Sequence, residues 1–315
     1  MDSRLAARLE AMLAAAPPRA GSLVVTLFGD VVSQHGGSVW LGGLVEALGR
    51  FGLNAGQVRT AVFRLARDGW LEATQHGRRS CYRLTASGQR QYARAAARIY
   101  APVHAEWDGE WTLVMPAGVA SGAREELRRR LGWLGFAPLA GGVLAHPRAP
   151  RAALAETLAE LGVSAQVVVW CARADDAPAL DALVREAWLL DELAARFEQF
   201  VLTFEPCATL LERAPPADEE AFVLRCLLIH EYRRLLLRSV DLPPALLPAS
   251  WPGHAAMALV AALYRRVQAP STAWVGAHLG NVEGPLPPPG DSFYRRFGGL
   301  VTTSPGAARA AAAGA

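Results

Sequence analysis

Three arginines are spaced along the stretch QVRTAVFRLARDGW, which runs from residue 57 to residue 70. A guanidinium group can bind phosphate oxygens, and it can donate two hydrogen bonds to guanine in the major groove of DNA. At about 100° per residue, a helix over this stretch carries Arg59, Thr60, Phe63, Arg64 and Arg67 on one side and Val58, Ala61, Val62 and Leu65 on the other. The spacing therefore predicts an amphipathic helix with a cationic side that is free to contact an anion.

The arginines alone allow two interpretations. The chain contains no lysine and all 32 of its basic residues are arginine, so arginine is common throughout it. In the first interpretation, the arginine-rich side of the helix is simply a solvated surface. The distribution of charge favours an anionic partner. Residues 1–98 hold 13 arginines and 6 acidic residues, a net +7, whereas the rest of the chain holds 19 and 23, a net −4. Such an asymmetry is typical of a protein whose one end meets a polyanion.

The elements around this helix decide what it can reach. Two preceding helices are predicted by SLVVTLFGDVVSQHG and VWLGGLVEALGRFG, while Asn54 and Gly69 are the N-cap and the C-terminal stop of the third. The runs WLEATQ and SCYRLT have strand character, and HGRR between them predicts a hairpin with Arg78 and Arg79 at its tip. A closing helix is predicted by ASGQRQYARAAARIY. This order is that of a winged helix-turn-helix domain, in which the third helix enters the major groove of DNA.

The position of each polar residue suggests the part of DNA that it contacts. The first turns of a recognition helix reach base edges, which predicts base contacts for Gln57, Arg59, Thr60 and Arg64. Phosphate contacts are predicted for Arg67, Arg78 and Arg79. Phe63 either contacts a thymine methyl group or packs under the hairpin.

The rest of the chain predicts an α+β protein of several parts. Residues 1–20 are predicted to be a flexible segment, 21–99 the winged helix, 100–177 a ferredoxin-like βαββαβ domain, 178–284 a mainly helical domain, and 285–315 a disordered tail. The last strand of the βαββαβ pattern, AQVVVWCA, is predicted to be buried. Helices are predicted at about 179–202, 217–239 and 254–268.

Four segments together resemble one known family. They are QVRTAVFRLARDGWL, GRRSCYRLT, WDGEWTLVM and IHEYRRLLLRSVDLPPALLPASWPG, and the similarity runs in the same order from about Gly21 to about Leu279. They resemble the PaaX-like family of bacterial repressors of phenylacetic acid degradation. The resemblance implies a homodimer that binds a palindromic operator in double-stranded DNA and is released from it by phenylacetyl-coenzyme A or a related aryl-coenzyme A.

Catalysis has to be weighed because the middle domain of this family is similar to the small nuclease subunit of CRISPR spacer-acquisition complexes. Such nucleases need an acidic residue at the end of the first strand to hold a metal ion. Met115 and Pro116 stand there instead. We therefore expect no catalytic residue, no metal and no cofactor. A metal-dependent nucleic-acid-processing enzyme and a winged-helix protein-interaction module remain as alternatives.

The segment LIHEYRRLLLR is close to a zinc-protease motif but lacks its second histidine, because Arg234 stands four residues after His230. In one interpretation, His230 and Tyr232 are simply buried helix residues. In the other, this region forms a pocket for an anionic acyl-coenzyme A, whose phosphates suit guanidinium groups. The candidate effector contacts are His230, Arg233, Arg234, Arg238, Trp251 and Tyr264, with Trp188 as a further aromatic candidate.

The amino terminus, MDSRLAARLE, has charges where a signal peptide needs an apolar centre. No uncharged apolar run approaches the roughly 20 residues that would span a bilayer. The expected location is the cytoplasm, with no contact to a membrane.

Overall fold

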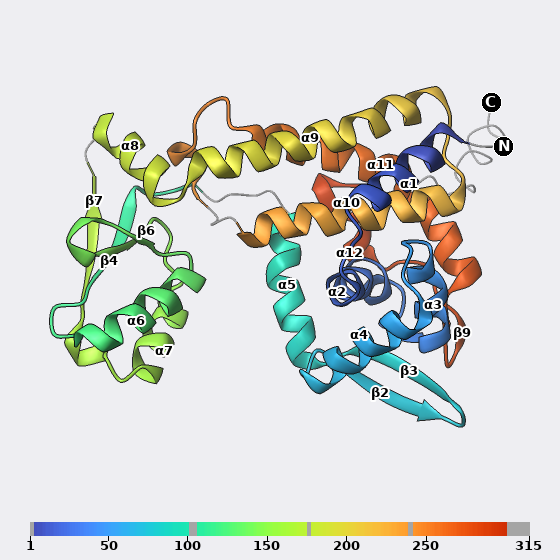
Figure 1. Ribbon diagram of the computed structural model, residues 1–315, viewed down its shortest axis with the longest axis horizontal. Helices are drawn as coiled ribbons and strands as arrows, with labels where there is room; N and C mark the ends of the chain where they lie inside the picture. The colour runs from blue at the N-terminus through green and yellow to red at the C-terminus, as the bar shows by residue number, and fades with distance from the viewer. Residues whose placement is uncertain (1–2, 101–105, 175–177, 239–241, 301–315) are drawn as a thin grey trace, which may run out of the picture. The chain divides into compact units, whose positions relative to one another are not determined.

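The computed structural model describes residues 3–100, 106–174, 178–238 and 242–300, apart from the side chains of residues 94, 95, 178 and 238 (Figure 1). The chain divides into two units. The first takes its residues from segments 1–102, 199–237 and 254–315, and the second from segments 103–198 and 238–253. The predicted winged helix and most of the predicted carboxy-terminal helices therefore form a single unit, not two separate domains.

Helix α2 (Ala20–Asp30) explains why these two parts are joined. Its sequence is apolar on every side, and a helix of that kind must be covered all around. Every residue from Leu23 to Asp30 is buried. Helix α4 packs along α2 from the amino-terminal part of the chain, and Thr26 Oγ1 lies 3.2 Å from His230 Nδ1 of the carboxy-terminal part.

The rest of the amino-terminal part follows the predicted order of helices and hairpin, except that residues 32–34 form a 3-10 helix and Val39 and Trp40, predicted as helical, lie in a strand. It consists of η1 (Val32–Gln34), β1 (Ser38–Trp40), α3 (Leu41–Gly49), α4 (Ala55–Arg67), β2 (Leu71–His76), β3 (Arg79–Leu84) and α5 (Ala86–Tyr100). The three strands form an antiparallel sheet of order β1-β3-β2. His76 pairs with Arg79, so the hairpin turns at Gly77 and Arg78.

Helices from both ends of the chain complete the first unit. These elements are α1 (Arg4–Ala15), α9 (Leu190–Arg213), which belongs to this unit from residue 199 on, α10 (Asp218–Arg238), α11 (Pro252–His278), β8 (Gly280–Asn281), β9 (Gly284–Pro285), α12 (Asp291–Tyr294) and η5 (Arg296–Gly298). The short strands β8 and β9 pair antiparallel.

Two segments that were predicted to be flexible are parts of the folded unit. Helix α1 buries Leu5 and Leu9, so the prediction for residues 1–20 is wrong over this helix. The segment after β9 buries Phe293 and Phe297, so the predicted disordered tail is wrong up to residue 300. The segment is rich in proline and glycine, a composition typical of disorder, and few of its residues are apolar. Residues 301–315 lie outside the described part of the chain.

The second unit has the predicted ferredoxin-like fold. Its elements are β4 (Glu110–Met115), α6 (Ser121–Trp133), β5 (Ala137–Pro138), η2 (Ala140–Gly142), β6 (Leu144–His146), α7 (Arg151–Glu160), η3 (Ser164–Gln166), β7 (Val168–Arg173), α8 (Pro178–Ala187) and η4 (Pro244–Leu246). The antiparallel sheet has the order β5-β6-β4-β7. Val114 and Leu144 of the sheet pack with Leu127 of α6 and Leu158 of α7.

Strand β7 differs from its prediction. Its sequence is a continuous apolar run, which favours a strand buried on both faces. The structure places it at the edge of the sheet, where Val168, Val169 and Trp170 are exposed by 39%, 39% and 53%. The prediction of a buried strand is therefore wrong, because the position of a strand in its sheet is not a property of its own sequence.

Candidate nucleic-acid interface

Helix α4 begins at a capping box. The Asn54 side chain accepts a hydrogen bond from the Gln57 backbone N–H at 2.9 Å, and Gln57 Oε1 accepts one from the Asn54 backbone N–H at 2.9 Å. The box fixes the first turn of the helix. It also engages the Gln57 side chain, which was predicted to contact bases: the carbonyl oxygen already accepts one hydrogen bond, and the amide nitrogen is not used by the box.

The apolar and cationic sides of α4 separate as predicted. Val58, Ala61 and Val62 are buried, whereas Arg59, Thr60 and Arg64 are exposed. Neither Arg59 nor Arg64 makes an ion pair or a side-chain hydrogen bond with any residue that the structure describes. Phe63 is 67% exposed, so it does not pack under the hairpin.

Arg67 stands apart from these two arginines. Its Nε lies 3.2 Å from Asp68 Oδ1, and both side chains are more than half exposed. A pair of this kind is worth little in water, so Arg67 can exchange it for a phosphate.

An open hollow of about 680 Å³ lies where α4 meets the start of α2. Arg19, Gln57, Thr60 and Arg64 are among its lining residues. Arg19 is exposed and forms the N-cap position of α2. Arg19 was not among the residues predicted to contact DNA, although its position just before the first apolar helix could have indicated it.

The hairpin presents its two arginines differently. Arg78 lies exposed in the turn beside Gly77, whose φ of 59° is the left-handed conformation that glycine adopts easily. Arg79 begins β3, and its guanidinium carbon lies 4.0 Å from the ring centroid of Trp40. Arg78 is therefore the tip residue, whereas a cation–π contact holds Arg79 at the base of the turn.

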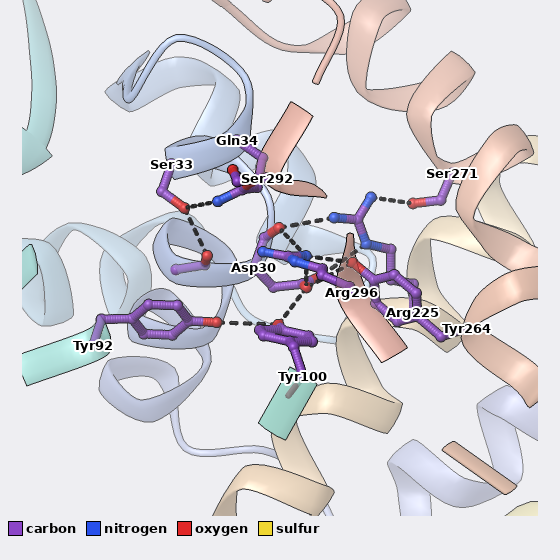
Figure 2. A network of polar contacts seen from close by, with 11 residues as sticks. Asp30, Ser33, Gln34, Tyr92, Tyr100, Arg225, Tyr264, Ser271, Ser292 and Arg296 are labelled. Carbon is purple, nitrogen blue, oxygen red and sulfur yellow. Dashed lines mark hydrogen bonds and ion pairs between the residues drawn. The ribbon is translucent and has the colours of Figure 1, made fainter. Parts of the chain in front are cut away.

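A buried polar network lies behind this surface (Figure 2). Asp30, at the end of α2, accepts hydrogen bonds from Arg225 Nε at 2.7 Å and from Arg296 Nη1 at 2.7 Å. The Tyr100 and Tyr264 hydroxyls donate to the same carboxylate at 2.5 and 2.9 Å. The network thus joins α2 to α5, α10, α11 and the segment after α12.

The charge of Asp30 is fixed by its partners. Burial alone would raise the pKa of Asp30, but attraction to Arg225 and Arg296 outweighs it, and the pKa lies below the usual 3.8. Burial raises the pKa of Tyr92 to about 12 and that of Tyr100 well above its usual value. The carboxylate is therefore ionised and these phenols are protonated at neutral pH.

The sequence is similar to that of known proteins over nearly its whole length. Residues 19–88 match the family described as PaaX-like protein, residues 104–184 the PaaX protein central Cas2-like domain, and residues 188–277 the PaaX-like protein C-terminal domain. The chain is 38% identical over 303 residues to the transcriptional repressor PaaX of Escherichia coli (strain K12), covering 95% of this chain and 96% of that protein. The chain belongs to the PaaX-like family.

A solved structure, the uncharacterized protein Rv0674 from Mycobacterium tuberculosis, is similar to this PaaX-like chain with a TM-score of 0.46 and 22% identity, over 73% of this chain and 90% of that one. Within the described residues, no helix is long and apolar enough to cross a membrane. Met115 lies at the end of β4 in the Cas2-like domain of this PaaX-like protein and is 36% exposed.

The predicted effector residues of this PaaX-like protein do not form one group. Tyr264 is fully buried in the Asp30 network, and Arg233 donates to the Ser22 carbonyl at 3.0 Å. Arg234 is exposed and pairs with Glu231 at 3.0 Å. Trp251 belongs to the second unit, where it packs edge-on against Phe197.

Three further candidates do not bring these residues together. His230 is buried and bonded to Thr26, and burial, followed by nearby Arg233, lowers its pKa to about 3. The Arg238 side chain lies outside the described residues. Trp188 donates from its indole nitrogen to the Gly135 carbonyl at 3.2 Å.

Asp30, Arg225 and Arg296 were not among the residues predicted from the sequence. A usable signal existed for the first two: each is the single charged residue within a long apolar run, SLVVTLFGDVV and AFVLRCLLI. A charge in such a run must find a partner when the run is buried.

Proposed function

We propose that this PaaX-like protein is a transcriptional repressor that binds DNA through helix α4 and the β2–β3 hairpin. The observation that carries the proposal is the exposed pair Arg59 and Arg64, two cations without an acidic partner among the described residues. An unpaired guanidinium on the exposed side of a helix is suited to binding base edges and phosphates. The E. coli relative, named a transcriptional repressor, supports the same function.

The contacts divide by position. Arg59, Thr60 and Arg64 lie on the exposed side of the helix and read base edges in the major groove. Arg67, Arg78 and Arg79 bind phosphates on either side. Gln57 contributes its amide nitrogen, because its carbonyl oxygen belongs to the capping box.

The full function includes a second copy and an effector. Two copies bind a palindromic operator, each placing one α4 in a half-site. Phenylacetyl-coenzyme A or a related aryl-coenzyme A binds one arrangement of the dimer more tightly than the other and so releases the DNA. The family resemblance supports this effector, as it supports action in the cytoplasm on an operon of aromatic-acid degradation.

Replacing Arg78 by alanine is expected to weaken DNA binding equally on all sequences, because a hairpin tip contacts phosphates. The plot of log affinity against log salt should lose about one unit of slope relative to the unaltered protein. Fluorescence anisotropy with labelled operator DNA at several salt concentrations measures this slope. Arg128→Ala is the control, since Arg128 is an exposed arginine of the second unit. Affinity that is independent of salt would instead favour a protein-interaction module.

Replacing Trp170 by arginine is expected to shift the protein from dimer to monomer. Among the described residues, strand β7 has no neighbour on one edge, and such an edge with exposed apolar side chains favours pairing with a second chain. Sedimentation velocity at micromolar concentration measures the mass. Leu183→Arg is the matched control, because Leu183 is also exposed in the same unit, but on helix α8. A dimeric Trp170→Arg variant would show that this edge is not the interface.

A further inference from the structure

The interior of the first unit holds more positive than negative charge. Of the described residues there, the buried ionised groups are Asp30, Arg225, Arg233 and Arg296. Asp30 pairs with Arg225 and Arg296, while the hydrogen bonds of Arg233 to described residues go to the carbonyl and hydroxyl of Ser22. One carboxylate therefore stands against three guanidinium groups.

The two buried histidines of this unit do not add to that charge. Burial and the charge of Arg225 lower the pKa of His35 to about 4. His230 is lowered to a pKa of about 3 by burial and by Arg233. Both imidazoles are neutral at pH 7, mainly because they are buried, so they add no charge to the interior.

Arg296 is bonded on one side only. Its Nη1 donates to Asp30 Oδ1 at 2.7 Å and to the Tyr264 hydroxyl at 2.5 Å, and its guanidinium carbon lies 3.9 Å from the ring centroid of Tyr100. Its Nε and Nη2 make no hydrogen bond with any described residue, although the side chain is only 5% exposed. These two donors are unused by the described residues and are not fully closed off from solvent, so they are suited to an oxyanion.

Arg296 is one of the residues that line an open cavity of about 550 Å³, a size typical of small-molecule sites. It is lined by Ser33, Gln34, Gly37, Leu84, Gln89, Tyr92, Ala93, Ala96, Tyr100, Ser292, Arg295 and Arg296. Arg295 is exposed and has no ion-pair partner among the described residues. The cavity thus combines two cations with an apolar wall, formed by Ala93 and Ala96 of α5 together with Leu84.

We propose that this cavity binds an organic anion, with carboxylate or phosphate oxygens on Arg295 and Arg296 and its apolar part along Ala93 and Ala96. The ligand neutralises part of the buried positive charge. That this anion is the effector rests on the proposed function. That the cavity binds an anion depends only on the charges and the cavity.

The walls of the cavity connect the ligand to the DNA-binding surface. Ser33 and Gln34 follow directly after α2, Leu84 ends the hairpin strand β3, and Tyr92 lies against α2 where a Cβ at Gly29 would be 1.8 Å from its ring. Arg295 and Arg296 come from the far end of the chain. A ligand that bridges these walls acts on both the helix behind α4 and the hairpin.

The test uses isothermal titration of the full chain with phenylacetate, coenzyme A and phenylacetyl-coenzyme A. Three variants are compared with the unaltered protein: Arg295→Ala removes a cation, Ala96→Phe fills the cavity, and Arg266→Ala removes an exposed arginine elsewhere in the unit. We expect at least tenfold weaker binding for the first two and no change for the third. Circular dichroism and operator affinity without ligand verify that each variant folds.

Binding of phenylacetate would assign the carboxylate to the cavity, and binding of coenzyme A would assign the phosphates; either supports the proposal if both cavity variants weaken it. Absence of binding by all three compounds would overturn it, as would binding that Arg295→Ala and Ala96→Phe leave unchanged. Operator affinity separates the two proposals. A protein that binds its operator but none of these anions refutes only the cavity, whereas one that binds anions but no DNA refutes only the repressor function.

Discussion

Replacing Asp30 by asparagine is expected to lower the free energy of unfolding by about 3 to 5 kcal/mol, the usual cost of removing one partner of a buried ion pair. The amide keeps the shape of the side chain but leaves Arg225 and Arg296 without their negative charge. Arg225 is fully buried and cannot recover hydration, and Arg296 is 6% exposed, so that water reaches it only in part. Chemical denaturation followed by tryptophan fluorescence and far-ultraviolet circular dichroism measures the change.

The pH dependence identifies the charge as the cause. The pKa of Asp30 in the folded protein is lower than the unfolded value of about 3.8, so its contribution is fully present above that value. It is lost as the pH falls through the lower folded pKa. The difference between the unaltered protein and the Asp30→Asn variant should therefore be constant from pH 5 to pH 7 and should shrink only below about pH 4.

An exposed carboxylate provides the comparison for this experiment. Asp68 pairs with Arg67 at the surface, and Asp68→Asn should change the free energy of unfolding by less than about 0.5 kcal/mol. An Asp30→Asn variant as stable as the Asp68→Asn variant would mean that the guanidinium groups of the network find other compensation. The role of the network in joining α2 to the carboxy-terminal helices would then be wrong.

Replacing Arg64 by alanine is expected to cost about 1 to 3 kcal/mol of operator affinity, which is roughly 5- to 150-fold, and to relax sequence preference at one position of each half-site. Arg64 is exposed on α4 and lines the hollow next to α2. It makes no ion pair with a described residue, so its loss should leave the fold intact. Titration of the operator and of single-base variants, at one fixed salt concentration, measures both effects.

Arg67→Ala is the matched comparison, because Arg67 lies one turn further along the same helix and is expected to contact phosphate. Its loss should weaken binding to operator and to unrelated DNA by the same factor. An equal loss on all sequences for Arg64→Ala would identify Arg64 as a phosphate contact. Base readout would then fall to Arg59 and Thr60 alone.

Local periodicity predicted which helices this protein has better than it predicted where they end. Helix α5 spans the predicted stretch from Ala86 to Tyr100. The helix predicted at 179–202 is instead broken at Leu189, whose φ is 52°, and α9 then continues through Pro206 to Arg213. Helix α11 likewise runs through Pro270 to His278, beyond the predicted end at 268. Packing on both sides of a long helix can outweigh the local cost of one proline.

The sequence by itself determined the family, the amphipathic helix α4 and the arginines on its free side. These depend on residue type and on spacing within one element, which the linear order records. Only the tertiary structure decided that α2 is enclosed on all sides, that β7 lies at an edge, and that Arg296 meets Asp30. Each of these features depends on how segments far apart in the chain are placed relative to one another. The partner of a buried charge is the group that lies next to it in space, which the linear order does not record.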